Sequence, residues 1–408
     1  MPARSIKLVP YLLALVSFTH IMDTMIVMPL GDIFIREFEI TAFQFTVIVS
    51  SYAVGAFLSS LVGSLYIDRF DRKRALQVIY IGFTVGTILC AFTPNYVTLV
   101  ATRFVTGLFG GVIGTLALAI VSDLFEFKER GAAVGILMTA FSAASALGVP
   151  LGLYLADLYN WHAPFLAVGG MGIALSIVIQ LYMPPIDGHL RLYDDDPELL
   201  SVPVAKPRLF DGLRAMSRDR NQLLALATGG VLVVGHMLII PFITPYMTRN
   251  VGLEQSMITW VYFVGGLLTV FTAPVFGRMT DRIGALRTFI ITMSAACAVV
   301  LILTNLPEVA VPVALVVTSL FFVFGSGRMI APNTLITAAV GPEGRGAFMS
   351  IKSALQQLAI GLASFASGLI VIIDERTGLV EYYWVVGILS VVIGLLVIPM
   401  AARLKVVG

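Results

Sequence analysis

One carboxylate stands apart among the residues that could perform chemistry. Asp23 lies in FTHIMDTMIVMP (residues 18–29) and is the only Asp or Glu well inside a long apolar run. A charged side chain in a membrane span costs about 2.5–3.5 kcal/mol on insertion scales, so such a residue is a functional candidate by default. His20 precedes it by three residues and shares its face if the run is helical. Asp23 is therefore a candidate for binding and releasing a proton.

A second buried charge falls at a matching depth. Asp23 lies six residues before Pro29, and Arg103 lies seven residues after Tyr96. If both segments are helices, both residues lie about 10 Å below the same surface and could pair. An arginine that approached in one conformation only would change the proton affinity of Asp23 through a transport cycle. A fixed ion pair that merely neutralises itself is the alternative.

Further polar residues in apolar runs are candidates for contacting a substrate. They are His20, Met22, His236, Arg328 and Asn333. Arg328 could bind an anionic group of a substrate, or it could anchor Asn333 and nearby carbonyl groups. Each histidine could equally make a polar contact between helices. Soft side chains such as Met22 suit the binding of varied apolar compounds, or they pack against lipid.

The composition identifies the elements that must position these residues. Of the 408 residues, 58% are hydrophobic and 12% are charged, about half the charged fraction of a soluble protein. Continuous apolar runs long enough to cross a bilayer predict helices and exclude the alternating pattern of a β-barrel. We predict twelve spans near residues 8–30, 43–66, 75–93, 97–122, 132–156, 163–183, 221–247, 257–280, 286–305, 311–339, 347–372 and 382–403.

The distribution of positive charge predicts the orientation of the chain. Most Lys and Arg residues fall in segments on the same side as the N-terminus, whereas Arg36, Arg249 and Arg376 fall on the other side. Positively charged loops stay in the cytoplasm, so both termini are expected there. Compact loops between spans are typical of a multi-pass protein of a bacterial inner (plasma) membrane.

The chain also repeats itself. Two segments of six spans, residues 1–183 and 221–408, flank a polar cytoplasmic linker at 184–220. Three features recur at offsets of 213 to 216 residues: Asp68-Arg69 as Asp281-Arg282, Arg130-Gly131-Ala132 as Arg345-Gly346-Ala347, and His20 with Pro29 as His236 with Pro245. Parallel repeats of this kind are typical of transporters that bind substrate near the membrane midplane between the halves.

Two loops carry a recognisable signature. SLYIDRFDRKR (64–74) and GRMTDRIGALR (277–287) resemble the cytoplasmic loop motif of the major facilitator superfamily, although Ser64 and Asp71 replace its two glycines in the first copy. The resemblance implies an all-α membrane fold of 12 transmembrane helices in two pseudo-symmetric six-helix bundles that work by alternating access. It also implies a gating role for the matching residues, which are Asp68, Arg69, Arg72, Gly277, Asp281 and Arg282. Charge-assisted hydrogen bonds could latch helix ends there. Simple retention of the loops in the cytoplasm is the alternative.

Two further motifs bear on mechanism. Arg103 followed by Gly107 resembles the R-x-x-x-G helix motif that the superfamily associates with proton coupling. GVPLG (148–152) resembles the superfamily's antiporter motif, but Val149 and Leu153 depart from it. Its glycines and Pro150 predict a kinked, tightly packed helix.

These observations predict a secondary active transporter rather than an enzyme. The sequence contains neither a phosphate-binding loop nor a credible nucleophile set, metal cluster or disulfide framework. We expect a monomer in the lipid bilayer, with no cofactor and no nucleic-acid partner, that exports small amphipathic or organic compounds in exchange for protons. One alternative is an organic-anion symporter or exchanger that uses Arg103 and Arg328. Another is a non-transporting membrane sensor on the same fold.

Overall fold

The computed structural model describes residues 3–66, 70–125, 127–187, 219–341, 345–405 and 407. These residues form an almost entirely helical protein, and twelve of its helical segments are long and apolar enough to cross a membrane. The predicted all-α class and the predicted number of spans are therefore confirmed, and the chain is a multi-pass membrane protein.

The described residues of the N-terminal half form ten helical segments. They are α1 (Ala3–Ile26), α2 (Gly31–Glu37), α3 (Ala42–Tyr66), α4 (Arg72–Ala91), α5 (Tyr96–Gly110), α6 (Ile113–Leu124), α7 (Phe127–Ala143), the π-helical turn η2 (Ala144–Gly148), α8 (Val149–Leu158) and α9 (His162–Tyr182). Of these segments, α2 connects spans one and two, and the other nine build the six spans.

The C-terminal six spans contain eight helical segments and a short hairpin. They are α13 (Arg220–Met237), the 3-10 turn η3 (Ile240–Phe242), α14 (Ile243–Arg249), α15 (Gln255–Ile283), α16 (Ala285–Leu303), α17 (Val311–Ala338), α18 (Arg345–Ile370), β1 (Ile372–Ile373), β2 (Val380–Glu381) and α19 (Tyr383–Ala402).

Three spans are interrupted where the sequence disfavours a regular helix. Span four breaks between α5 and α6 at Gly110–Gly111, and span seven breaks between α13 and α14 around Pro241, which has no N–H to donate. In span five the π-helical turn η2 comes just before Pro150. A π-helical turn is a usual cause of a bend inside a helix.

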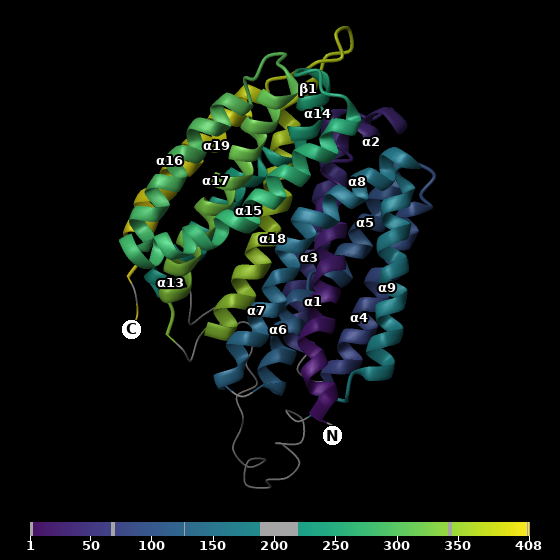
Figure 1. The fold of residues 1–408 in the computed structure, drawn as a ribbon, viewed down its shortest axis with the longest axis vertical. Helices are drawn as coiled ribbons and strands as arrows, with labels where there is room; N and C mark the ends of the chain where they lie inside the picture. Colours follow the sequence, from purple (N-terminus) through teal and green to yellow (C-terminus); the bar gives the residue numbers. More distant parts are fainter. Residues whose placement is uncertain are drawn as a thin grey trace.

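Both chain termini lie toward one end of the molecule, whereas α2, α14 and the β1–β2 hairpin lie at the other (Figure 1). We call these ends the termini side and the far side. In the hairpin, Ile372 pairs with Glu381 and Ile373 pairs with Val380 in antiparallel register. The short helix α2 and this hairpin were not predicted from the sequence, whereas α14 lies largely within the predicted span 221–247.

The sequence repeat has a counterpart in the packing of the two halves. In the N-terminal half, a Cβ added at Gly110 would lie 3.3 Å from Nε2 of His20. In the C-terminal half, a Cβ added at Gly325 would lie 3.1 Å from Cε1 of His236. Each first span of a half therefore packs a histidine against a glycine of the fourth span, at nearly the offset found in the sequence.

The two halves are joined at the far side. α3 of the N-terminal half packs along α18 of the C-terminal half. The rings of Phe43 and Phe365 lie 5.1 Å apart, and Ser50 Oγ donates to the carbonyl of Gly361 at 3.0 Å. One large apolar cluster of far-side residues, including Phe45 and Phe242, draws on both halves.

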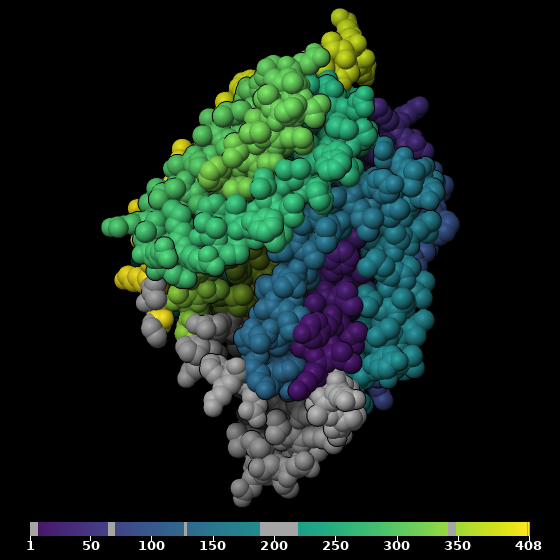
Figure 2. Space-filling view, viewed as in Figure 1, coloured from purple at the N-terminus to yellow at the C-terminus, as the bar shows by residue number. Residues whose placement is uncertain are grey.

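Toward the termini side the halves pack separately. One apolar cluster there contains only N-terminal residues, such as Leu13, Tyr80 and Leu137. Two others contain only C-terminal residues, such as Phe348 and Phe289. Figure 2 shows the surface hollowed between the C-terminal half and α7, with α18 recessed in the hollow. The structure is therefore closed at the far side, and its halves diverge toward the termini.

Candidate functional site

The predicted proximity of Asp23 and Arg103 is confirmed. Arg103 on α5 donates from Nη1 to Oδ2 of Asp23 on α1 at 2.7 Å, and the two side chains are 1% and 0% exposed. Thr87 on α4 donates from Oγ1 to the other carboxylate oxygen at 3.1 Å. Both oxygens of Asp23 are thus bonded, and three helices hold the carboxylate in place.

An aromatic side chain completes this cluster. The guanidinium carbon of Arg103 lies 4.5 Å from the ring centroid of Tyr52 on α3, a cation–π contact. The Tyr52 hydroxyl is 3.0 Å from Nε2 of His20, which lies one turn before Asp23 on α1. Spans one to four therefore meet around Asp23, His20, Tyr52, Thr87 and Arg103, which we call the N-half cluster.

The N-half cluster is a neutral ion pair enclosed in protein. Removing one partner of such a pair would leave an uncompensated buried charge, whereas the intact pair offsets much of its own desolvation. Nε of Arg103 has no hydrogen-bond partner among the described residues. The Nε–H group of Arg103 is therefore available to form a new hydrogen bond if the side chains of the cluster rearrange.

The three predicted residues of the C-terminal half fall in two pairs, the second of which includes Lys352, a residue that was not among the predicted ones. Arg328 Nη2 on α17 donates to Nδ1 of His236 on α13 at 2.5 Å. Lys352 Nζ on α18 donates to Oδ1 of Asn333 on α17 at 2.6 Å. The side chain of Asn333 is therefore held by Lys352 and by the Met329 carbonyl, which accepts from its Nδ2 at 2.8 Å, and no bond joins it to Arg328.

The five predicted substrate-contacting residues are divided between the halves. His20 belongs to the N-half cluster, and His236, Arg328 and Asn333 lie in the C-terminal half. Met22 is buried in a small apolar cluster with Ala144 and Val168, inside the N-terminal half. The structure does not bring all five together.

The predicted gating residues lie mainly at helix ends on the termini side. Asp68 and Arg69 fall outside the described residues. Arg72, at the start of α4, donates from Nε to Oδ2 of Asp123 at 2.9 Å. Asp281 and Arg282 are exposed at the end of α15, and Gly277 lies one turn earlier. The chain turns into α16 through Gly284, whose φ of +89° favours glycine.

A salt bridge between the halves, which was not predicted from the sequence, lies at the far side. Asp32 on α2 is 1% exposed and accepts from Nε of Arg249, at the end of α14, at 2.5 Å. Arg36, one turn along α2, contacts the other carboxylate oxygen at 2.5 Å. The two partners are 217 residues apart, and each sits in an ordinary-looking polar loop segment of the sequence, so nothing local indicates that they meet.

The β1–β2 hairpin supports the Arg249 side of this contact. Arg249 Nη1 donates to the carbonyl of Gly378 at 3.2 Å. The next residue, Asn250, exchanges two hydrogen bonds with the backbone of Val380, at 3.0 Å and 2.9 Å. We call Asp32, Arg249 and the hairpin residues that hold Arg249 the far-side lock.

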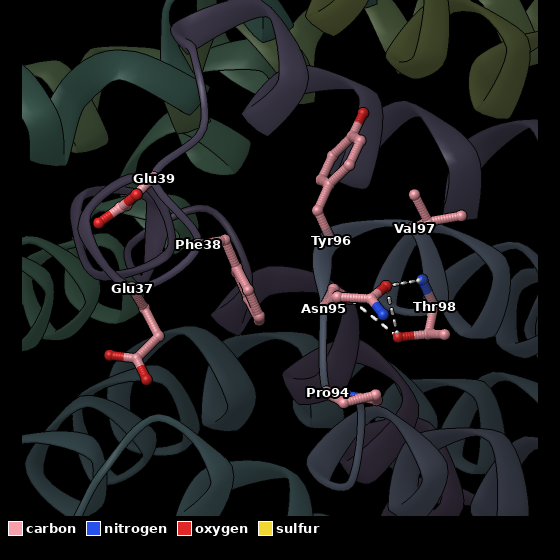
Figure 3. Close-up of a pocket in the computed structure, with 8 residues that line it drawn as sticks. All are labelled: Glu37, Phe38, Glu39, Pro94, Asn95, Tyr96, Val97 and Thr98. Carbon is pink, nitrogen blue, oxygen red and sulfur yellow. Dashed lines mark hydrogen bonds between the residues drawn. The ribbon is translucent and has the colours of Figure 1, made fainter.

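A surface pocket is lined by none of the site residues described above. A pocket of about 550 Å³ lies at the far side beside the start of α5, between Glu37–Glu39 and Pro94–Thr98 (Figure 3). Asn95 caps α5 there by accepting from Thr98 N at 3.0 Å. The pocket includes none of the predicted site residues. Among the described residues, no three His, Cys, Asp or Glu side chains are grouped to hold a metal ion.

This architecture defines a polytopic helical transporter of two related halves. Profiles of the Major Facilitator Superfamily match residues 13–235 and 225–406. The chain belongs to this superfamily and is therefore a secondary transporter, not an enzyme.

Individual relatives are distant. The uncharacterized MFS-type transporter YbcL of Bacillus subtilis is 23% identical, over 95% of this chain and 93% of its own. The inner membrane transport protein YdhP of Escherichia coli K12 is 23% identical, with 87% and 86% covered. A probable sugar efflux transporter of Helicobacter pylori is 24% identical, over 60% of this chain and 58% of its own.

Two solved structures share the fold. A bacterial homologue of the human lysosomal transporter Spinster, in an inward-facing and unoccupied conformation, superposes with a TM-score of 0.78 at 15% identity, covering 98% of this chain and 97% of its own. A D-xylose-proton symporter superposes with a TM-score of 0.71 at 16% identity, with both chains fully covered.

Proposed function

We propose that the protein couples the movement of protons to the export of small amphipathic or organic compounds. The observation that carries this proposal is the fully buried Asp23–Arg103 pair. A transporter needs a group whose proton affinity differs between conformations. A carboxylate beside a guanidinium favours its charged form, and the same carboxylate in apolar surroundings favours its protonated form.

The N-half cluster suggests how the switch would work. In the described conformation the Arg103 guanidinium donates to the carboxyl group of Asp23 at 2.7 Å. Withdrawal of the guanidinium from Asp23, while it keeps the contact it already makes with the Tyr52 ring, would let Asp23 take up a proton. Protonation would in turn release Arg103. Each proton that crosses the membrane adds about 2.3 kcal/mol per 100 mV of membrane potential.

Alternating access requires the far side to open and the termini side to close. We propose that residues 1–183 and 221–408 rock as two bundles joined by the linker 184–220. Opening the far side would break the Asp32–Arg249 salt bridge. Closing the termini side would bring together the loops that carry Asp68, Arg69, Arg72, Gly277, Asp281 and Arg282. With both termini in the cytoplasm of a cell with an inner membrane, the described conformation is open inward.

The names of two similar proteins support the proposed export and the proposed coupling of transport to protons. One relative is called a probable sugar efflux transporter, and one protein of the same fold is a proton symporter. We propose that this chain acts as a monomer with a small-molecule substrate, protons and the lipid bilayer as its partners, and that it binds no nucleic acid.

Transport into proteoliposomes tests the proposal. Compounds that raise the melting temperature of the purified protein would be offered to proteoliposomes with and without an imposed proton gradient. We expect the gradient to accelerate transport by the wild type and by Asp157→Asn, a control that alters an exposed acid, but not by Asp23→Asn. Equal rates with and without the gradient in the wild type would exclude proton coupling.

A further inference from the structure

The membrane interior of the C-terminal half carries positive charge without a matching acid. Arg328 and Lys352 are 2% and 7% exposed, on α17 and α18. In the part of the chain from 220 onward that the structure describes, every acidic residue falls at the end of a helix or in a connection. These residues are Glu254, Asp281, Glu308, Asp374, Glu375 and Glu381.

The N-terminal half differs in this respect. There Arg103 is neutralised by Asp23 at 2.7 Å. Among the described residues, no carboxylate forms a salt bridge with Arg328 or Lys352, and Nε of Arg328 has no hydrogen-bond partner. The contact from Arg328 to Nδ1 of His236 supplies an acceptor but no negative charge. A buried, unpaired cation is costly, so a protein that keeps one usually has a use for it.

The two cationic pairs lie at successive depths from the termini side. Asn333, which accepts from Lys352, is five residues from the end of α17 at Ala338, or about 7 Å along the helix. Arg328 is ten residues from that end, or about 15 Å. The halves diverge toward this same side, so Lys352 lies nearer to the open end of the molecule and Arg328 lies deeper.

We propose that the C-terminal half binds an anionic group of the transported compound, a carboxylate or a sulfonate, with Arg328 as its main ligand. This inference rests on the proposed transport function and names its substrate class. The guanidinium presents several donors in a planar fork that matches such a group, and Nε is free to join the contact. His236 positions the guanidinium, and Lys352 with Asn333 forms the outer step of the path. Arg103 is not part of this anion site, because its guanidinium already donates to the carboxyl group of Asp23.

A matched series of three probes separates charge from shape. Benzoate, benzamide and benzamidinium have nearly the same body and carry a negative, a zero and a positive charge. Each would be titrated against the purified full-length protein in a thermal-unfolding assay at constant ionic strength. We expect benzoate to raise the melting temperature in a saturable way, and the other two to leave it unchanged.

Variants of Arg328 assign the effect to this site. We expect Arg328→Gln to weaken benzoate binding about 10- to 100-fold, the usual range for a charge-assisted hydrogen bond. Arg328→Lys keeps the charge but loses the fork, and it should retain part of the effect. Arg403→Gln, which changes an exposed arginine after α19, should bind benzoate like the wild type.

The melting temperature without ligand tests the purely structural alternative. If Arg328 only braces α17 against α13, Arg328→Gln should unfold earlier than the wild type. If the guanidinium awaits an anion, removing its unpaired charge should leave the melting temperature unchanged or raise it. An earlier unfolding together with undiminished benzoate binding would overturn the proposal. So would a larger shift with benzamidinium, or no shift with benzoate.

A failure of the anion-site proposal can be distinguished from a failure of the proposed proton coupling. Asp23→Asn should still bind benzoate, because the N-half cluster is separate from Arg328. Proton-driven transport that depends on Asp23, combined with no preference for benzoate over benzamide, would remove the anion site alone.

Discussion

At the scale of single residues, the charged partners of the first and fourth spans could be predicted, but their polar neighbours could not. A carboxylate and a guanidinium inside apolar runs stand out because each is costly there, and helix rise places them at one depth. Tyr52 and Thr87 are residue types that apolar helices tolerate without a partner. Their contacts with Arg103 and Asp23 therefore emerge only from the packing of spans two and three against spans one and four.

The stability of the N-half cluster gives a prediction at this scale. We expect Asp23→Asn and Arg103→Gln each to destabilise the protein by about 3–5 kcal/mol, because each leaves one buried charge unpaired. The double variant should lose less than the sum of the two, because it removes both charges. Chemical-denaturation midpoints of the three variants, with Asp157→Asn as the surface control, measure this coupling. Strict additivity would mean that the two charges do not stabilise each other.

At the scale of elements, apolar runs predicted where spans lie but not where spans four and seven break; only the kink in span five was predicted, from Pro150 and its neighbouring glycines. Such runs report burial in lipid, and the bilayer tolerates a broken helix when neighbouring helices pack around the break. Spans four, five and seven are accordingly each made of more than one segment. The β1–β2 hairpin escaped prediction because its strands are two residues long, too short to show any alternation.

Close packing of α3 against α18 gives a prediction at this scale. A Cβ at Gly368 would collide with Oγ1 of Thr46, so only glycine allows this approach. We expect Gly368→Ala to weaken the contact between the halves at the far side and lower the melting temperature, and Thr46→Ala to restore part of the loss.

Gly170→Ala provides the control for this change. Gly170 is an exposed helical glycine whose added Cβ meets no atom within 4 Å. It should leave the protein unchanged or more stable by up to about 1 kcal/mol. Equal melting temperatures for Gly368→Ala and Gly170→Ala would show that the contact tolerates a methyl group.

The turn of the hairpin responds to pH in a defined direction. A hydrogen bond from Thr377 Oγ1 at 2.6 Å, helped by the backbone N–H groups of Arg376 and Thr377, lowers the pKa of Asp374. The turn therefore gains stability above the ordinary aspartate pKa of about 3.9, and loses it as the pH falls through the lowered value. Thr377→Ala should shift this loss to higher pH. Hydrogen exchange of the hairpin amides, corrected for intrinsic rates, would follow the change.

At the scale of the whole molecule, the repeat predicted two halves but not the conformation in which they rest. Offsets along a sequence are the same whether the far side is open or closed. The closed far side depends on contacts between residues far apart in the chain, above all Asp32 with Arg249. These contacts have no local signature, because each partner alone resembles a solvated loop charge.

The far-side lock gives a prediction at this scale. We expect Asp32→Asn or Arg249→Gln to shift the protein toward conformations open at the far side, because each variant removes one partner of a nearly buried salt bridge. Spin labels at Val97→Cys and Arg376→Cys, one in each half, would report the change as a longer mean distance. Asp157→Asn should keep the wild-type distribution, and an unchanged distribution in both lock variants would show that the apolar contacts alone keep the far side shut.

The turn at residues 374–378 is a surface segment through which the conformation of the protein could be controlled from outside the membrane. The carbonyl of Gly378 in this turn accepts a hydrogen bond from the guanidinium of Arg249. A nanobody that bound the turn in this conformation would therefore stabilise the far-side lock and keep the far side closed. If the termini lie in the cytoplasm, as proposed above, this turn faces the outside of the cell, and an inhibitor could bind it without entering the cell.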